Sequence, residues 1–82
     1  MSALEINELQ ALVEPCFDLY RLKECRGSLT KIEDLQIKAV ARENYACQTR
    51  LLGLQTDLML IMNNPKRKAS PLGMIKEVKR FC

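Results

Sequence analysis

Eight positions in the middle of the chain recur in steps of three and four residues, and all but one are apolar. This set, the first stripe, is Ile37, Val40, Asn44, Cys47, Leu51, Leu54, Leu58 and Ile61. Such spacing is typical of a helix with a coiled-coil-like apolar edge. The rest of an 82-residue chain is too small to cover a stripe of this length. We therefore expect a second copy of the chain to cover it, with Asn44 fixing the register of the two helices.

A second apolar stripe runs one position further on and consists of Tyr45, Leu52 and Met59, joined by Met62. Two adjacent stripes make a broad apolar face, which is typical of a helix that packs between two neighbours in a bundle. In this interpretation the first helix of the chain covers one stripe. A second copy, or a different helical protein, covers the other.

The beginning of the chain predicts one bent helix over about residues 3–25. Ser2 with Glu5 three residues later forms a capping box, which marks a helix start. Pro15 removes one backbone donor and is expected to bend the helix. Gly27 follows as a residue suited to the left-handed conformation that ends helices.

A second capping box, Thr30 with Glu33, predicts a helix over about residues 31–62, roughly 50 Å long at 1.5 Å per residue. A basic loop over 63–70 and a short amphipathic helix over about 71–81 follow. The expected fold is all-α, with one domain over 1–82. It is a helical hairpin with a long second helix and a short C-terminal helix, and it dimerises into a four-helix bundle.

The four cysteines do not form a metal-binding motif. No C-x-x-C occurs and the chain has no histidine, so we expect no metal and no cofactor. Cys16 and Cys47 fall on apolar helical faces and are predicted to be small core residues. No apolar run is long enough to span a membrane, and no signal peptide is evident. We expect a reduced, soluble, cytoplasmic protein that makes no membrane contact.

Charge is distributed unevenly along the chain. Residues 1–63 carry seven Lys/Arg and nine Asp/Glu, whereas residues 64–82 carry six Lys/Arg and one Glu. Such asymmetry indicates a polyanion or an acidic partner more often than a small substrate. The carboxylates are scattered, and a glycine-rich phosphate loop is not found. We therefore expect neither enzymatic activity nor a small-molecule substrate.

Several basic residues are arranged so that two long helices side by side would match double-stranded RNA. Lys31, Lys38 and Arg42 lie away from the first stripe, and Arg50 flanks it. A rigid surface about 50 Å long would cross successive grooves of an A-form duplex, which proteins recognise by shape and backbone contacts. The basic residues of the loop, Lys66, Arg67 and Lys68, would add phosphate contacts. The alternative is that these cations form an ordinary solvated helix face.

The segment Ala46-Cys47-Gln48-Thr49-Arg50, the upstream Lys38 and Arg42, and the break at Pro65 before a short helix resemble one family. This family is the small nodaviral suppressors of RNA silencing, and the resemblance covers roughly residues 30–80. It implies a viral, antiparallel homodimer that binds double-stranded RNA in the host-cell cytoplasm. It also places Arg50 and Cys47 near the RNA, whereas the first stripe places Cys47 inside the bundle.

Two functions are therefore expected. The first is sequence-independent binding of double-stranded RNA, which would suppress RNA silencing by shielding the duplex from processing. The alternative is a helical-hairpin protein-interaction module, such as a small secretion chaperone, whose exposed stripe docks on another helical protein.

Overall fold

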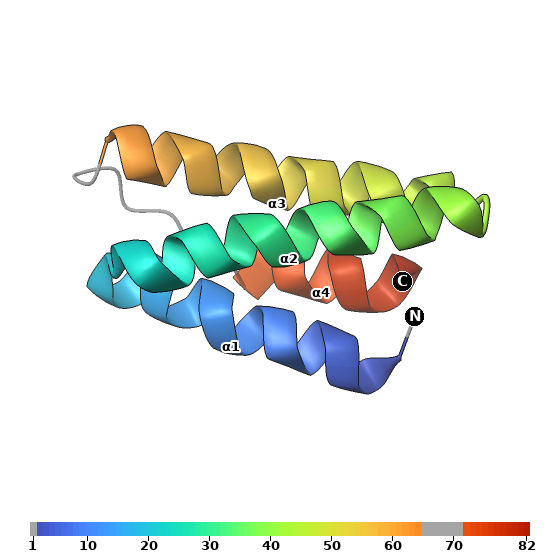
Figure 1. The fold of residues 1–82 in the computed structure, drawn as a ribbon, viewed down its shortest axis with the longest axis horizontal. Helices are drawn as coiled ribbons and strands as arrows, with labels where there is room; N and C mark the ends of the chain where they lie inside the picture. Colours follow the sequence, from blue (N-terminus) through green and yellow to red (C-terminus); the bar gives the residue numbers. More distant parts are fainter. Residues whose placement is uncertain (1, 65–71) are drawn as a thin grey trace.

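The computed structural model describes residues 2–64 and 72–82 of the chain. These residues form four helices without a strand, which confirms the all-α prediction. The helices are α1 (Ala3–Leu19), α2 (Leu22–Ala41), α3 (Tyr45–Asn63) and α4 (Leu72–Phe81). In Figure 1, α2 crosses the front of the bundle, α3 lies above it, α1 below it and α4 behind. The N- and C-terminal ends of the chain lie at the same end of the bundle.

The prediction of one helix over 3–25 is wrong, because the chain reverses at Tyr20. This residue has a left-handed backbone with φ of 52°, and α2 begins two residues later at Leu22. The Tyr20 hydroxyl donates a 2.7 Å hydrogen bond to the carbonyl oxygen of Met62. This bond fixes the turn against the end of α3, so a contact 42 residues away supports the reversal.

Gly27 does not end a helix but lies inside α2. A Cβ at this position would lie 3.3 Å from the Leu12 side chain on α1, so the missing side chain lets the two helices approach closely. Thr30 is also inside α2 rather than at a helix start, and its hydroxyl donates to the carbonyl of Arg26. Pro15 lies within α1, which continues for four more residues.

The prediction of a single helix over 31–62 is also wrong, because the chain turns between α2 and α3. Glu43 has φ of 56°, and the amides of Glu43 and Asn44 donate to the carbonyls of Val40 and Ala39. These bonds form a Schellman motif, with Glu43 in the place that glycine usually occupies. Asn44 then caps α3, because its side-chain oxygen accepts from the Cys47 amide at 3.2 Å.

The core lies between the four helices and takes up most of the first stripe. The buried members of that stripe are Cys47, Leu51, Leu54, Leu58 and Ile61. All of them except Ile61 belong to one core cluster with buried residues of the other three helices, such as Leu9, Ile32 and Val78. One chain thus supplies the cover that the sequence assigned to a second copy. Ile37 and Val40 are exposed instead, with Ile37 71% accessible.

The C-terminal helix agrees closely with its prediction over 71–81, since α4 spans Leu72–Phe81. Asn63 belongs to α3 rather than to the predicted loop, and Asn64 follows as its C-cap. The rest of the basic loop over 65–70 lies outside the described residues.

All four cysteines form disulfides, which corrects the prediction that they are reduced. Cys16–Cys25 joins α1 to α2, and Cys47–Cys82 joins the first turn of α3 to the residue after α4. The sequence did place Cys16 and Cys47 in the core, and both are fully buried. Their pairing depends on the turns at Tyr20 and Glu43, which bring distant parts of the chain together.

Candidate protein-interaction surface

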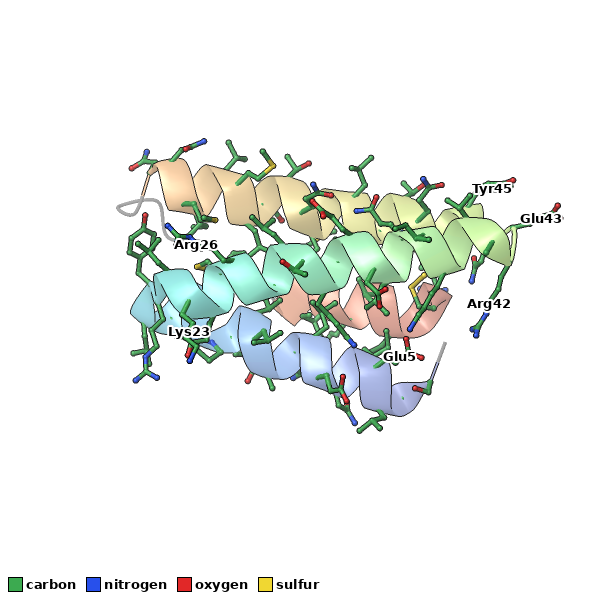
Figure 2. All side chains as sticks on the ribbon, viewed as in Figure 1. Glu5, Lys23, Arg26, Arg42, Glu43 and Tyr45 are labelled. Atoms are coloured by element: carbon green, nitrogen blue, oxygen red, sulfur yellow. A yellow bond between two sulfur atoms is a disulfide. The ribbon has the colours of Figure 1, made fainter. Side chains whose placement is uncertain are left out.

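Seven large apolar residues are exposed on α2 and α3, which form a helical hairpin, and Leu22 and Leu60 are two of them. We define the α2–α3 face by the other five, which are Ile37, Val40, Tyr45, Leu52 and Met59. Tyr45, at the start of α3, extends away from the bundle in Figure 2. Leu52 and Met59 follow Tyr45 at intervals of seven residues, so these three residues lie on one side of α3. The second stripe predicted from the sequence is therefore accessible, with Leu52 51% exposed.

A shallow cavity of about 490 Å³ hollows the α2–α3 face near the turn between the helices. It is lined by Glu33, Gln36, Ile37, Val40 and Gln48. Such a hollow can receive an apolar side chain from another helix, because two of its five lining residues are aliphatic and two are neutral amides.

Neutral polar side chains on this face form hydrogen bonds within the chain, and one of these bonds joins the two helices. The Gln36 amide donates a 2.7 Å hydrogen bond to the Gln55 side-chain oxygen, which links α2 to α3. The hydroxyls of Thr49 and Thr56 donate to carbonyls one turn back in α3. These groups are bonded within the chain, so covering them does not require breaking an ion pair.

Helix α3 carries only two charged residues, Arg50 and Asp57. Arg50 Nε lies 3.5 Å from the Glu77 carboxylate on α4, so this cation is directed toward α4. Interface centres are typically poor in charge and rich in aromatic residues and methionine. The exposed side of α3 has this composition.

The turn at Glu43 separates Arg50 on α3 from the predicted RNA-binding residues of α2 and its C-cap. Lys31 on α2 forms an ion pair with Glu8 on α1 at 3.0 Å. Lys38 pairs with Glu5 at 3.1 Å and with Asp34 at 3.4 Å. The Lys38 hydrogen bond lowers the pKa of the Glu5 carboxyl, and the carboxylates of Glu5 and Asp34 raise the pKa of Lys38.

The other residues predicted to bind RNA, Arg42, Cys47 and Arg50 among them, differ from one another in burial and in their contacts. The Arg50 guanidinium stacks on the Phe81 ring, with its central carbon 4.2 Å from the ring centre. Cys47 is fully buried in its disulfide, which agrees with the first stripe rather than with an RNA-facing position. Arg42 is exposed at the α2–α3 turn and extends away from α3 in Figure 2. Lys66, Arg67 and Lys68 lie outside the described residues. A single basic row 50 Å long is therefore not formed by Lys31, Lys38, Arg42 and Arg50.

Across residues 2–64 and 72–82, no cluster of three or more acidic, histidine or cysteine side chains is placed to hold a metal ion. Within the same residues, no helix is both long and apolar enough to cross a membrane.

No family model, curated protein or solved structure matches this chain. The sequence indicated the α3 part of the α2–α3 face through its second stripe. It missed the exposure of Ile37 and Val40, because these were assigned to the continuous first stripe.

Proposed function

We propose that the protein is a helical interaction module that pairs with a second copy through the α2–α3 face. The observation that carries this proposal is an exposed, apolar and nearly uncharged side of α3, arranged symmetrically about Leu52. The two copies would be antiparallel along α3. This proposal keeps the homodimer expected from the sequence but assigns it to the second stripe.

The spacing on α3 suits an isologous contact, in which the same patch on both copies must be complementary to itself. Tyr45 and Met59 each lie seven residues from Leu52, which is about 10.5 Å along a helix. A two-fold axis at Leu52 would place Tyr45 of one copy opposite Met59 of the other. It would also place Thr49 opposite Gln55, so neutral polar groups would face one another.

The chemistry of these pairs is favourable. A methionine sulfur near an aromatic ring contributes about 0.3–1.5 kcal/mol. Contact between the two Leu52 side chains would remove apolar surface from water at the centre of the interface. Because the exposed side of α3 is charge-poor, the α3 helices of two copies would meet without strong like-charge repulsion.

Light scattering of the oxidised protein tests the proposal, with the mass expected at twice the 9.4 kDa of one chain. Leu52→Glu would place two carboxylates at the two-fold axis and should give a monomer. Leu4→Glu is the matched control, because Leu4 is 67% exposed on α1, away from the α2–α3 face. Circular dichroism would establish that both variants remain helical.

A folded wild-type monomer at about 100 μM, a concentration at which even weak pairs associate, would contradict self-association. Equal dissociation by Leu52→Glu and Leu4→Glu would contradict the position of the interface. If the wild-type protein is a monomer, the α2–α3 face would instead bind a different helical protein, which is the alternative function expected from the sequence.

The two disulfides are relevant to the cellular compartment in which the protein is found. Disulfides persist mainly in oxidising compartments, whereas the cytoplasm keeps thiols reduced. Because Cys16–Cys25 and Cys47–Cys82 account for every cysteine of the chain, we propose an oxidising compartment in place of the cytoplasm.

Binding of double-stranded RNA stays a prediction. Its support is the formal net charge of +3 and the resemblance to the nodaviral suppressors. The continuous helix from which its geometry was derived is replaced by α2 and α3, so any RNA surface would need a different arrangement of cations.

A further inference from the structure

The two disulfides differ in their access to solvent. Cys16, Cys25 and Cys47 are fully buried, whereas Cys82 is partly exposed. Cys82 also lines a cavity of about 390 Å³. Of the four cysteines, Cys82 is therefore the one that a reagent in this cavity would contact, whereas Cys16 and Cys25 have no accessible surface.

Among the residues that the structure describes, the other walls of the cavity come from the start of α1, its N-cap and α4. They are Ser2, Ala3, Ile6, Asn7 and Lys79. The volume falls within the range of about 300–1,000 Å³ that is typical of small-molecule sites. None of these residues belongs to the α2–α3 face, so the cavity is separate from the proposed interface.

The charges around the cavity favour an anion. Lys79 supplies a positive charge three residues before Cys82, and the N-terminus of α1 adds the positive end of a helix dipole. Glu5 lies in the same first turn of α1, but its carboxylate pairs with Lys38. A small thiol that carries carboxylates, such as glutathione, matches both the size and the charge of the cavity.

We propose that this cavity is a thiol–disulfide exchange site for a small anionic peptide thiol. The incoming thiolate attacks Cys82 Sγ and forms a new sulfur–sulfur bond with it. The bond between Cys82 and Cys47 breaks, and its electron pair leaves on Cys47 Sγ. The products are a mixed disulfide at Cys82 and a thiolate at Cys47.

Two features of Cys47 act in opposite directions on its role as the leaving group. It is the third residue of α3, where the helix N-terminus stabilises a thiolate, whereas its full burial disfavours the charged form. A second thiolate can then attack the external sulfur of the mixed disulfide. That step releases the oxidised small thiol and leaves a thiolate on Cys82. The covalent link between α3 and α4 is thus reversible, while Cys16–Cys25 stays closed.

The test treats the oxidised full chain with reduced glutathione, quenches it with acid at early times and maps the peptides by mass spectrometry. The glutathione adduct is expected on Cys82, with Cys47 free. Cys16–Cys25 should open at least roughly tenfold more slowly, because its sulfurs are buried. An adduct mainly on Cys47, or equal opening of both disulfides, would overturn the proposal.

Charge recognition is tested separately with Lys79→Gln. This variant should slow the reaction with glutathione about threefold, as expected for one lost charge contact near the surface. The reaction with cysteamine, a cationic thiol, should not slow. Lys76→Gln is the matched control, because Lys76 is exposed on α4 but does not line the cavity. Slowing with both thiols, or with neither, would contradict an anionic substrate.

A third measurement does not depend on the wild-type disulfide. Cys47→Ser leaves Cys82 as a thiol, and oxidised glutathione should form a stable adduct there. Cys82→Ser leaves Cys47, which should react more slowly because it is buried. The reverse order of rates in folded variants would overturn the assignment of Cys82 as the accessible sulfur.

Discussion

The side-chain amide of Asn44 donates a 3.0 Å hydrogen bond to the carbonyl oxygen of Phe81. The oxygen of the same side chain accepts from the Cys47 amide and caps α3. One residue between α2 and α3 therefore begins α3 and also holds the end of α4. The disulfide Cys47–Cys82 lies beside this pair and links the same two helix ends.

The two roles of Asn44 can be separated by substitution. Asn44→Ala removes both bonds and should lower the free energy of unfolding by about 2 kcal/mol, from the cap and the hydrogen bond together. Asn44→Ser keeps an oxygen that can cap α3 but loses the amide donor, so about half of that loss is expected. Urea unfolding measures both values. A serine variant as stable as the wild type would show that the Phe81 bond does not contribute.

Leu54 of the first stripe and Leu52 of the second stripe should respond differently to substitution by alanine, because only Leu54 is buried. Leu54 is fully buried, and Leu54→Ala should lower the free energy of unfolding by about 2–5 kcal/mol. Leu52 is half exposed, and Leu52→Ala should cost less than about 1 kcal/mol when measured at protein concentrations low enough to prevent association. Chemical denaturation at two protein concentrations checks this difference. Similar losses at both positions would contradict the orientation of α3.

Removal of each disulfide should lower the free energy of unfolding by an amount that depends on the length of chain the disulfide closes. The bridges span sequence separations of 9 and 35 residues. From loop-closure entropy, loss of Cys16–Cys25 should cost about 3 kcal/mol and loss of Cys47–Cys82 about 4 kcal/mol. Paired Cys→Ala variants compared by thermal unfolding test this order. A larger loss for the shorter loop would show that native packing outweighs chain entropy.

The sequence predicted the helices where local signals were sufficient. Ser2 and Glu5 cap α1 as expected, since the Glu5 amide donates to the Ser2 hydroxyl at 3.2 Å. Both turns that define the topology were missed. Tyr20 and Glu43 adopt left-handed backbones that non-glycine residues seldom adopt, so neither residue type signals a turn. The glycine that does signal one, Gly27, instead makes room for a neighbouring helix.

The missed turns also explain why only the α3 part of the α2–α3 face could be predicted from the sequence. The spacing of Tyr45, Leu52 and Met59 is local to α3, so the sequence indicated a second stripe that needs a cover. The exposure of Ile37 depends on the turn at Glu43, which ends the regular continuation of the first stripe. Contacts such as that between Tyr20 and Met62 join residues far apart in sequence, and no pattern in a single sequence indicates them.

The ion pair between Glu5 and Lys38 predicts a specific pH dependence. The pKa of Glu5 is lowered, first by its hydrogen bond with Lys38, so its contribution is complete above the ordinary glutamate pKa. The contribution is lost as the pH falls through the lowered folded-state pKa. Glu5→Gln should therefore lower the thermal midpoint by a few degrees at most near pH 7, with little difference near pH 2.

The same ion pair shifts the pKa of Lys38 in the opposite direction from that of Glu5. Its pKa is raised, first by the hydrogen bond with Glu5, so its contribution is lost only as the pH rises through the raised value. A constant difference between Glu5→Gln and wild type from pH 2 to pH 7 would contradict the lowered pKa.

Binding of double-stranded RNA makes a prediction that separates Arg42 from Arg50. Arg42 is exposed at a turn, whereas Arg50 is held by Glu77 and Phe81. Arg42→Gln should therefore weaken binding more than Arg50→Gln, and loss of one phosphate contact should reduce the salt slope by about 1. Gel-shift titrations with a duplex of about 20 base pairs, long enough to present successive grooves, measure both effects. Absence of a shift by the wild-type protein at micromolar concentration would rule out this function. A shift that both variants leave unchanged would exclude the α2–α3 turn and α3 as the RNA-binding surface.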